Sequence, residues 1–219
     1  PTATQWSPLI TLPPKPHLYV PILIESGLQR LHKNPAQESL NQLHQSRLSR
    51  FAYLSNFPSY SIIHLSDEEG YDADSWYSLI PSHVTIFRNF YHSRLLSLHR
   101  RLHSFPIGPR DIFIKPESSY DSLIKCSERF YPWSFMGTLW DSGSRRLSVS
   151  LFLTHIPNGF YYGGKRFGSG LSLPNYKHIL SNSVFALAPE GDRHLDTFRL
   201  WESLSCGCIP LVVDHNFTA

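Results

Sequence analysis

One continuous segment near the end of the chain restricts the fold more than any other part. Residues 184–188 form a short apolar run closed by proline, as expected of a strand that is buried on both faces of a parallel sheet. Asp196 stands where a helix N-cap is expected, and apolar residues recur after it at helical spacing until Gly207. Residues 209–213 are a second apolar run, rich in β-branched residues. The segment therefore predicts a strand, a helix and a second parallel strand, which together form a βαβ crossover.

The loop between the first strand and the helix is the expected binding region. In open parallel sheets, ligands bind beyond the carboxyl ends of the strands, so residues 189–195 should face a crevice. The following helix start offers free backbone N–H groups and a positive dipole end, which suit a phosphate or diphosphate. The candidate binding residues in this region are Glu190, Gly191, Arg193, Asp196, Thr197, Arg199 and Glu202.

The acidic residues of this region need a different partner, because carboxylates repel phosphate. Glu190 and Asp192 suit uncharged hydroxyl groups, such as those of a ribose or a sugar. We expect Glu202 to contact a ribose. Arg199 and Glu202 lie three residues apart on one helix face, where the alternative is a surface ion pair worth roughly a few tenths of a kcal/mol.

Several segments share their order and motifs with a known family. They are IIHLSDEEG at residues 62–70, TIFRNFY at 85–91, YPWSFMGTLWDSGSRR at 131–146 and FALAPEGDRHLDTFRLWESLSCGCIPLVV at 185–213. Together they resemble the exostosin-like glycosyltransferases, and most closely the ribitol xylosyltransferase branch. The resemblance implies transfer of a sugar from a nucleotide-diphosphate donor to a glycan or another hydroxyl acceptor.

The resemblance also implies a GT-B-like α/β fold, in which two Rossmann-like halves face each other across a cleft. Prolines and glycines concentrate in residues 104–119, and we expect the linker there or just beyond. Residues 1–118 should then form an acceptor-side α/β domain with an irregular lead-in. Residues 119–219 should form the second half, an incomplete nucleotide-sugar-binding α/β domain.

Glycosyl transfer requires stabilisation of the departing nucleoside diphosphate and deprotonation of the acceptor if the reaction inverts. We expect Arg199, supported by Arg145 and the helix start, to neutralise the leaving group. The resemblance implies that no metal or cofactor takes part and that a UDP-linked sugar is the substrate. Asp67 is the preferred base, with Glu68 and His64 behind it, because these residues end a strand in the opposite half. A metal site built on the same three residues lacks a fourth ligand.

The remaining pattern predicts the elements that carry these residues. Strands are expected at residues 60–65, 84–87 and 133–138, and helices at 34–54, at 91–102 and from near Arg145. Arg145 and Arg146 then stand at a helix N-terminus, where the alternative to anion binding is a solvated arginine pair. Residues 159–170 hold five glycines without a phosphate-binding pattern, which favours a mobile surface loop.

Charge and cysteine content exclude other classes. The net charge of +3 comes with scattered basic residues, so no nucleic-acid partner is expected. Three cysteines without a C-x-x-C pair indicate neither a disulfide framework nor a zinc site, and they favour a reducing compartment. No membrane segment or signal peptide is visible. We therefore expect a cytoplasmic enzyme if the source is bacterial, or a Golgi-lumen enzyme if it is a eukaryotic relative that has lost its anchor.

Two other functions remain open. Fucosyltransferases are similar in having a helix, a glycine and a P-V-V-type strand in their donor site, although the HLSDE segment argues against them. The second is a non-catalytic nucleotide-sugar-binding module. The chain ends at Ala219, soon after its last apolar run, whereas family members continue. We therefore expect a truncated enzyme that keeps its nucleotide pocket, has weak or absent turnover, and tends to associate.

Overall fold

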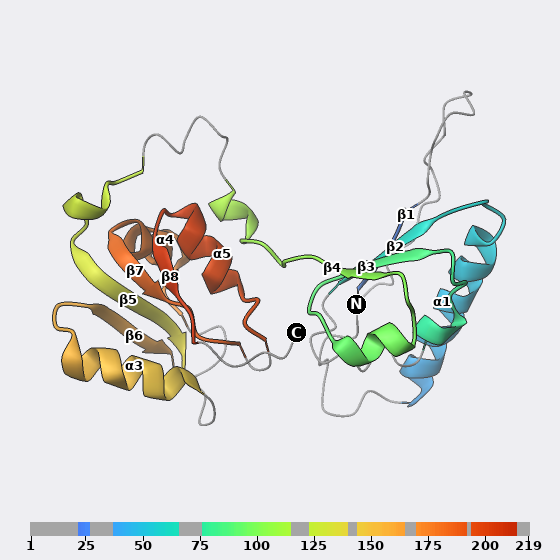
Figure 1. Cartoon of the computed structure of the whole chain (residues 1–219), viewed down its shortest axis with the longest axis horizontal. Helices are drawn as coiled ribbons and strands as arrows, with labels where there is room; N and C mark the ends of the chain where they lie inside the picture. The colour runs from blue at the N-terminus through green and yellow to red at the C-terminus, as the bar shows by residue number, and fades with distance from the viewer. Residues whose placement is uncertain are drawn as a thin grey trace.

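The computed structural model describes residues 22–26, 37–65, 76–114, 123–139, 144–164, 170–191 and 194–213. It contains two four-stranded sheets in two separate lobes (Figure 1). The first sheet consists of β1 (Ile22–Ser26), β2 (Ser61–Leu65), β3 (Thr85–Arg88) and β4 (Leu102–Ser104). The second consists of β5 (Tyr131–Thr138), β6 (Phe160–Gly164), β7 (Ser183–Leu187) and β8 (Ile209–Leu211). All neighbouring strands are parallel, which confirms the expected α/β class.

The first sheet has the strand order β1-β2-β3-β4. Helix α1 (Gln37–Leu54) joins β1 to β2 and packs on the sheet through Phe51. Ile62 and Ile86, which stand in register on adjacent strands, are fully buried beneath it, together with Trp76. This helix and the strands β2 and β3 follow the predicted pattern. The start of the predicted helix, residues 34–36, lies outside the described residues.

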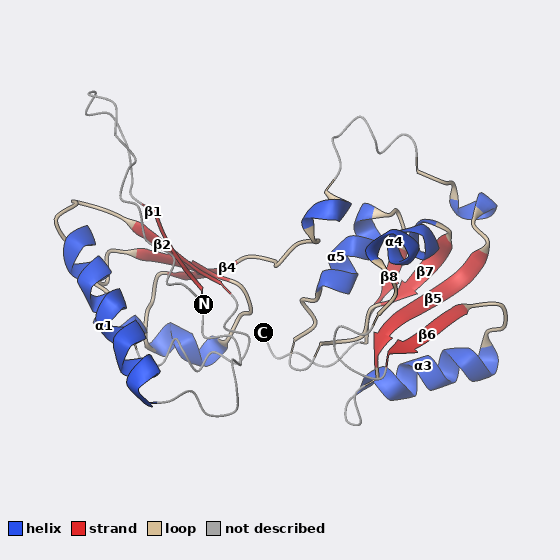
Figure 2. Cartoon of the chain, turned by 180° about the vertical axis from the view of Figure 1, so that it is seen from behind, coloured by secondary structure: helices blue, strands red, loops and turns tan. Residues whose placement is uncertain are grey.

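The second sheet has the strand order β6-β5-β7-β8. Helix α3 (Ser144–His155) covers one face, whereas α4 (Leu173–Ser181) and α5 (Phe198–Ser205) cover the other (Figure 2). Alternate residues of β5 supply both cores: Phe135 packs on the α3 side and Met136 on the α4 side. From β5 the chain adds β6 on one side and then β7 and β8 on the other. The order therefore reverses between β5 and β7, which makes this position the switch point of the sheet.

The expected βαβ crossover is confirmed, with one correction. β7, α5 and β8 follow one another, and β7 pairs with β8 in parallel. Asp196 is not the helix N-cap, because Thr197 takes this position and its Oγ1 accepts the backbone N–H of Leu200 at 3.4 Å. Gly207 ends the helix with a φ of +71°, a conformation that glycine adopts without strain.

Two other predictions are wrong. Residues 91–102 do not form a helix: they contain a 3₁₀ turn at Ser93–Ser97, and Leu102 then enters β4 opposite Ile86. Local helical spacing depends only on neighbouring residues and cannot predict pairing with a distant strand. The pairing with β3 therefore overrides it. The glycine-rich segment is not only a loop, because β6 pairs with β5 in parallel. Gly159 precedes β6 and leaves room for the ring of Trp133, which lies where a Cβ atom would stand.

The chain passes from one lobe to the other after β4 (Figure 1). Residues 105–114, which we call the connector, leave β4 and include a 3₁₀ turn at Asp111–Phe113. The expected domain boundary between residues 118 and 119 lies outside the described residues and stays a prediction. None of the described helices has the length and apolar character needed to span a membrane.

Candidate functional site

Arg145 joins the two strands that flank the switch point. Its side chain reaches back from the start of α3, and Nη1 donates to the carbonyl oxygen of Thr138 at 2.7 Å. Nη2 donates to the carbonyl oxygen of Glu190 at 2.6 Å, in the loop after β7. Arg145 is buried. It therefore holds a positive charge at the carboxyl end of β5 and is not a solvated surface residue.

Arg199 places a second guanidinium group at the same strand end. Its Nε donates to the carbonyl oxygen of Met136 at 3.3 Å, and its Cζ lies 4.9 Å from the ring centre of Phe135. Gly137 leaves room for it, since a Cβ atom there would lie 2.2 Å from Nη2 of Arg199. Burial lowers the pKa of Arg199, and the nearby Tyr176 opposes that effect.

These two arginines form a cationic end on the second sheet. Both side chains bind backbone oxygens of the last three residues of β5, at Met136 and Thr138. Among the described residues, no carboxylate forms a salt bridge with Arg199. The start of α3 at Ser144 lies in the same region and adds its positive dipole end. Guanidinium groups beside a helix start suit a bound phosphate or diphosphate.

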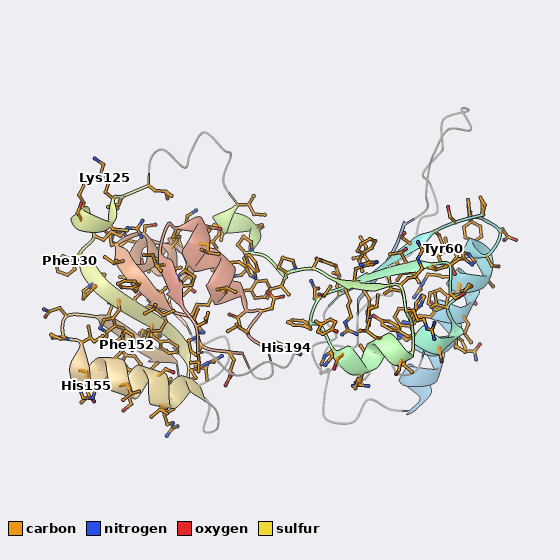
Figure 3. The ribbon with its side chains drawn as sticks, in the orientation of Figure 1. Tyr60, Lys125, Phe130, Phe152, His155 and His194 are labelled. Atoms are coloured by element: carbon orange, nitrogen blue, oxygen red, sulfur yellow. The ribbon has the colours of Figure 1, made fainter. Side chains whose placement is uncertain are left out.

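A pocket of about 340 Å³ lies where the two lobes meet. It is formed in the first lobe by residues after β3 and by the end of β4 with the residues that follow it, and in the second lobe by the loop between β7 and α5. Its lining residues are Phe90, Tyr91, Ser104, Phe105, Pro106, His194, Leu195 and Asp196. Figure 3 shows His194 on the side of the second lobe that faces the first. The pocket thus combines aromatic surfaces with a few polar groups, as ligand sites commonly do.

Phe90 has an unusual backbone conformation at this pocket. Its φ is +56°, which is uncommon for a bulky residue and is often found at functional sites. The Nε of Arg88 stabilises this turn by donating to the carbonyl oxygens of Asn89 at 2.8 Å and of Phe90 at 3.0 Å. The rings of Phe90 and His92 lie 5.4 and 4.7 Å from the ring of His194. The turn after β3 therefore contacts the loop after β7 directly.

Asp196 connects the lobes instead of capping α5. Its Oδ2 accepts the backbone N–H of Ile107, in the connector, at 3.0 Å. Its Oδ1 accepts the indole N–H of Trp201 at 2.5 Å. Both carboxylate oxygens are therefore engaged within the protein, so Asp196 positions the connector beside the pocket.

Glu202 is buried and does not form the surface ion pair considered from its spacing to Arg199. Both of its carboxylate oxygens accept from Arg110 in the connector: Oε1 from Nε, and Oε2 from Nη2 at 3.1 Å. The Arg110 guanidinium also lies over the rings of Phe113 and Tyr176, at 5.6 and 5.5 Å from their centres. A ribose contact at Glu202 would have to compete with this ion pair.

The expected catalytic residues are only partly within the described chain. His64 is buried in β2, where its Nδ1 lies 2.9 Å from the hydroxyl of Tyr77 and its ring packs on Trp76. A histidine enclosed in this way has no access to an acceptor hydroxyl, so His64 is a core residue. Asp67 and Glu68 lie outside the described residues.

The other expected binding residues lie around the loop after β7. The N–H of Gly191 donates to the carbonyl oxygen of His194 at 2.6 Å. Thr197 caps α5, and Glu190 supplies the carbonyl oxygen that Arg145 binds. Arg193 lies outside the described residues, as does Asp192. Within the described ranges, no group of three or more His, Cys, Asp or Glu side chains could hold a metal ion.

Sequence reasoning missed the pocket residues of the first lobe and the connector arginine. Phe90 comes shortly after the strand predicted at residues 84–87, and binding residues often lie beyond strand ends, so the sequence did contain a signal for it. The sequence contained no signal for Arg110, because this residue lies in a proline-rich connector 92 residues before Glu202. No family model matches the chain, and no curated protein sequence matches it either. The function has to be argued from these residues.

Proposed function

We propose that this protein is a glycosyltransferase of the GT-B type, which transfers a sugar from a nucleotide-diphosphate donor, UDP-linked, to a glycan or another hydroxyl acceptor. The observation that carries the proposal is the cationic end of the second sheet, where Arg145 and Arg199 bind the last residues of β5. The resemblance of the chain to the exostosin-like family points to the same reaction.

The donor diphosphate is assigned to this cationic end. Sugar transfer leaves negative charge on the departing diphosphate, and preorganised guanidinium groups stabilise such charge without reorganising during the reaction. Arg145 is fixed by two backbone carbonyls and Arg199 by one, so both are preorganised. Arg199 is the principal binding group because it is without a salt-bridge partner among the described residues.

The acceptor is assigned to the aromatic pocket between the lobes. Phe90, Tyr91 and Phe105 offer ring faces on which the apolar face of a sugar ring can pack. Asp67 and Glu68 follow β2, which runs parallel to β3, the strand that Phe90 follows. Parallel strands end at the same edge, so the proposal keeps one of these two carboxylates as the base that deprotonates the acceptor.

A non-catalytic nucleotide-sugar-binding module is the second candidate. It is favoured by the engagement of the described acidic and basic groups in structural contacts: Asp196 with the connector, Glu202 with Arg110, and His64 with Tyr77. Such a module would bind the donor at the same arginines without turnover.

The proposal is tested with a panel of nucleotide-diphosphate sugars. Thermal unfolding detects binding, since a ligand that binds the native state raises Tm. Release of nucleoside diphosphate, with and without hydroxyl acceptors, detects turnover. We expect Arg199→Ala to lose both, and Asp67→Asn or Glu68→Gln to lose turnover while binding remains. Binding without turnover in the parent protein supports the module, and a parent protein that binds no nucleotide sugar contradicts both candidates.

A further inference from the structure

We propose that Arg110 is a positioning residue that holds Glu202 away from Arg199, so that Arg199 keeps its positive charge for an anionic ligand. The inference rests on the proposed function, because the ligand is the donor diphosphate. It assigns to the connector between the lobes a direct role in the affinity of the second lobe for its substrate.

Glu202 and Arg199 would otherwise pair with each other. They stand three residues apart on α5, a spacing at which side chains of opposite charge are neighbours. Glu202 is 1% exposed, and a buried carboxylate without a cationic partner is strongly unfavourable. Its charge therefore needs a guanidinium group, and two are within reach: Arg199 on the same helix and Arg110 in the connector.

In the structure Glu202 forms its ion pair with Arg110. The contact is a fork in which Nε and Nη2 of Arg110 bind the two carboxylate oxygens separately, the strongest arrangement that an arginine and a carboxylate can form. The rings of Phe113 and Tyr176 support the guanidinium from the connector and from α4. The Glu202 carboxylate raises the pKa of Arg110, through this hydrogen-bonded contact first.

Arg199 is left with neutral partners. It donates to a backbone carbonyl of Met136 and lies over the ring of Phe135, and no described carboxylate forms a salt bridge with it. Burial lowers the pKa of Arg199, and this effect outweighs the opposing effects of Tyr176 and Glu202. The Glu202 carboxylate still attracts Arg199 through space, and an anionic ligand would add a negative charge in direct contact with it.

The experiment measures binding of UDP and of inorganic pyrophosphate to the full chain by calorimetry. Four variants are compared with the parent protein: Arg110→Gln, Glu202→Gln, the double variant carrying both changes, and Arg199→Ala. Arg100→Gln is the matched control, because it removes one exposed positive charge from the first lobe. Circular dichroism and Tm establish that each variant is folded.

Arg110→Gln should weaken both ligands about 10-fold, because the freed Glu202 carboxylate then pairs with Arg199. The double variant should recover affinity to within about 3-fold of the parent protein, a rescue that a merely structural role of Arg110 would not produce. Glu202→Gln should bind pyrophosphate at least as tightly as the parent protein does. Should Arg110→Gln fail to fold, the Glu202→Gln result decides alone.

Three results would overturn the inference while leaving the proposed function intact, provided that Arg199→Ala loses binding. They are an Arg110→Gln variant that binds like Arg100→Gln, a double variant no better than Arg110→Gln, and a Glu202→Gln variant with weaker pyrophosphate binding. A parent protein that binds neither UDP nor pyrophosphate would contradict the proposed function and the inference together.

Discussion

Gly137→Ala should weaken nucleotide binding by displacing Arg199. A Cβ atom at this position would lie 2.2 Å from Nη2 and 3.3 Å from Cζ of Arg199, well inside ordinary van der Waals contact. The guanidinium is the far end of a flexible side chain, whereas Gly137 is held in β5 opposite Gly163 of β6. The side chain of Arg199 should therefore move, and alanine also adds backbone strain at this position because φ is +159°.

The magnitude follows from the contacts that Arg199 would lose. Its hydrogen bond to Met136 involves a charged donor and is worth about 1.5–3 kcal/mol. Its position over Phe135 contributes about 0.5–2 kcal/mol more. Part of this loss is regained when the guanidinium reaches water, so we expect stability to fall by about 1–2 kcal/mol. Loss of one charge-assisted hydrogen bond to the ligand should weaken UDP binding roughly 10- to 100-fold.

Calorimetric titration of UDP measures the affinity, and urea unfolding measures the stability. Gly163→Ala is the matched control, because its added methyl group would meet the hydroxyl of Tyr161 at 2.2 Å and not Arg199. UDP affinity in Gly137→Ala equal to that of the parent protein would refute the reasoning. An equal loss in Gly163→Ala would assign the effect to the strands and not to Arg199.

Three further variants or conditions test other parts of the structure. Gly207→Ala should destabilise by about 1–3 kcal/mol in urea unfolding, because φ is +71° and the Cβ would lie 2.7 Å from Nη2 of Arg129; an unchanged midpoint contradicts this. Asp196→Ala should cost about 1–3 kcal/mol by the same assay, with Asp196→Asn losing less because it keeps one acceptor; equal losses would contradict it. Burial raises the pKa of Cys208 from 9.0 to about 12, so the free energy of unfolding should fall as pH rises from 9 towards 12. A profile identical to that of Cys208→Ala would contradict this.

The local parts of the fold were predictable from the sequence. The strands β2, β3, β5 and β7 coincide with apolar runs, and α5 begins after a polar loop and ends shortly before Gly207. These signals depend only on neighbouring residues. Predictions failed where a distant partner decides the outcome. Leu102 belongs to β4 because it pairs with β3. Asp196 is not the N-cap of α5 because its side chain binds Ile107, 89 residues away in the chain.

In the candidate site, too, local features were predictable and contacts between distant residues were not. Arg145 and Arg199 were expected on the helices that follow two different strands and were expected to act on the same leaving group, because strand ends and helix starts can be placed from local patterns. The partner of Glu202 was not predictable, since Arg110 stands in a connector without periodicity. The burial of His64 also depends on Trp76 and Tyr77, whose packing no spacing rule reveals.

The central claim is that the cationic end of the second sheet binds the diphosphate of a nucleotide. The most direct measurement is a calorimetric titration of the parent protein with UDP, UMP and uridine at two salt concentrations. If Arg145 and Arg199 contact the diphosphate, affinity should fall in the order UDP, UMP, uridine, and UDP binding should weaken as salt rises. Equal affinity for UDP and uridine, or the absence of UDP binding at low salt, would contradict the account.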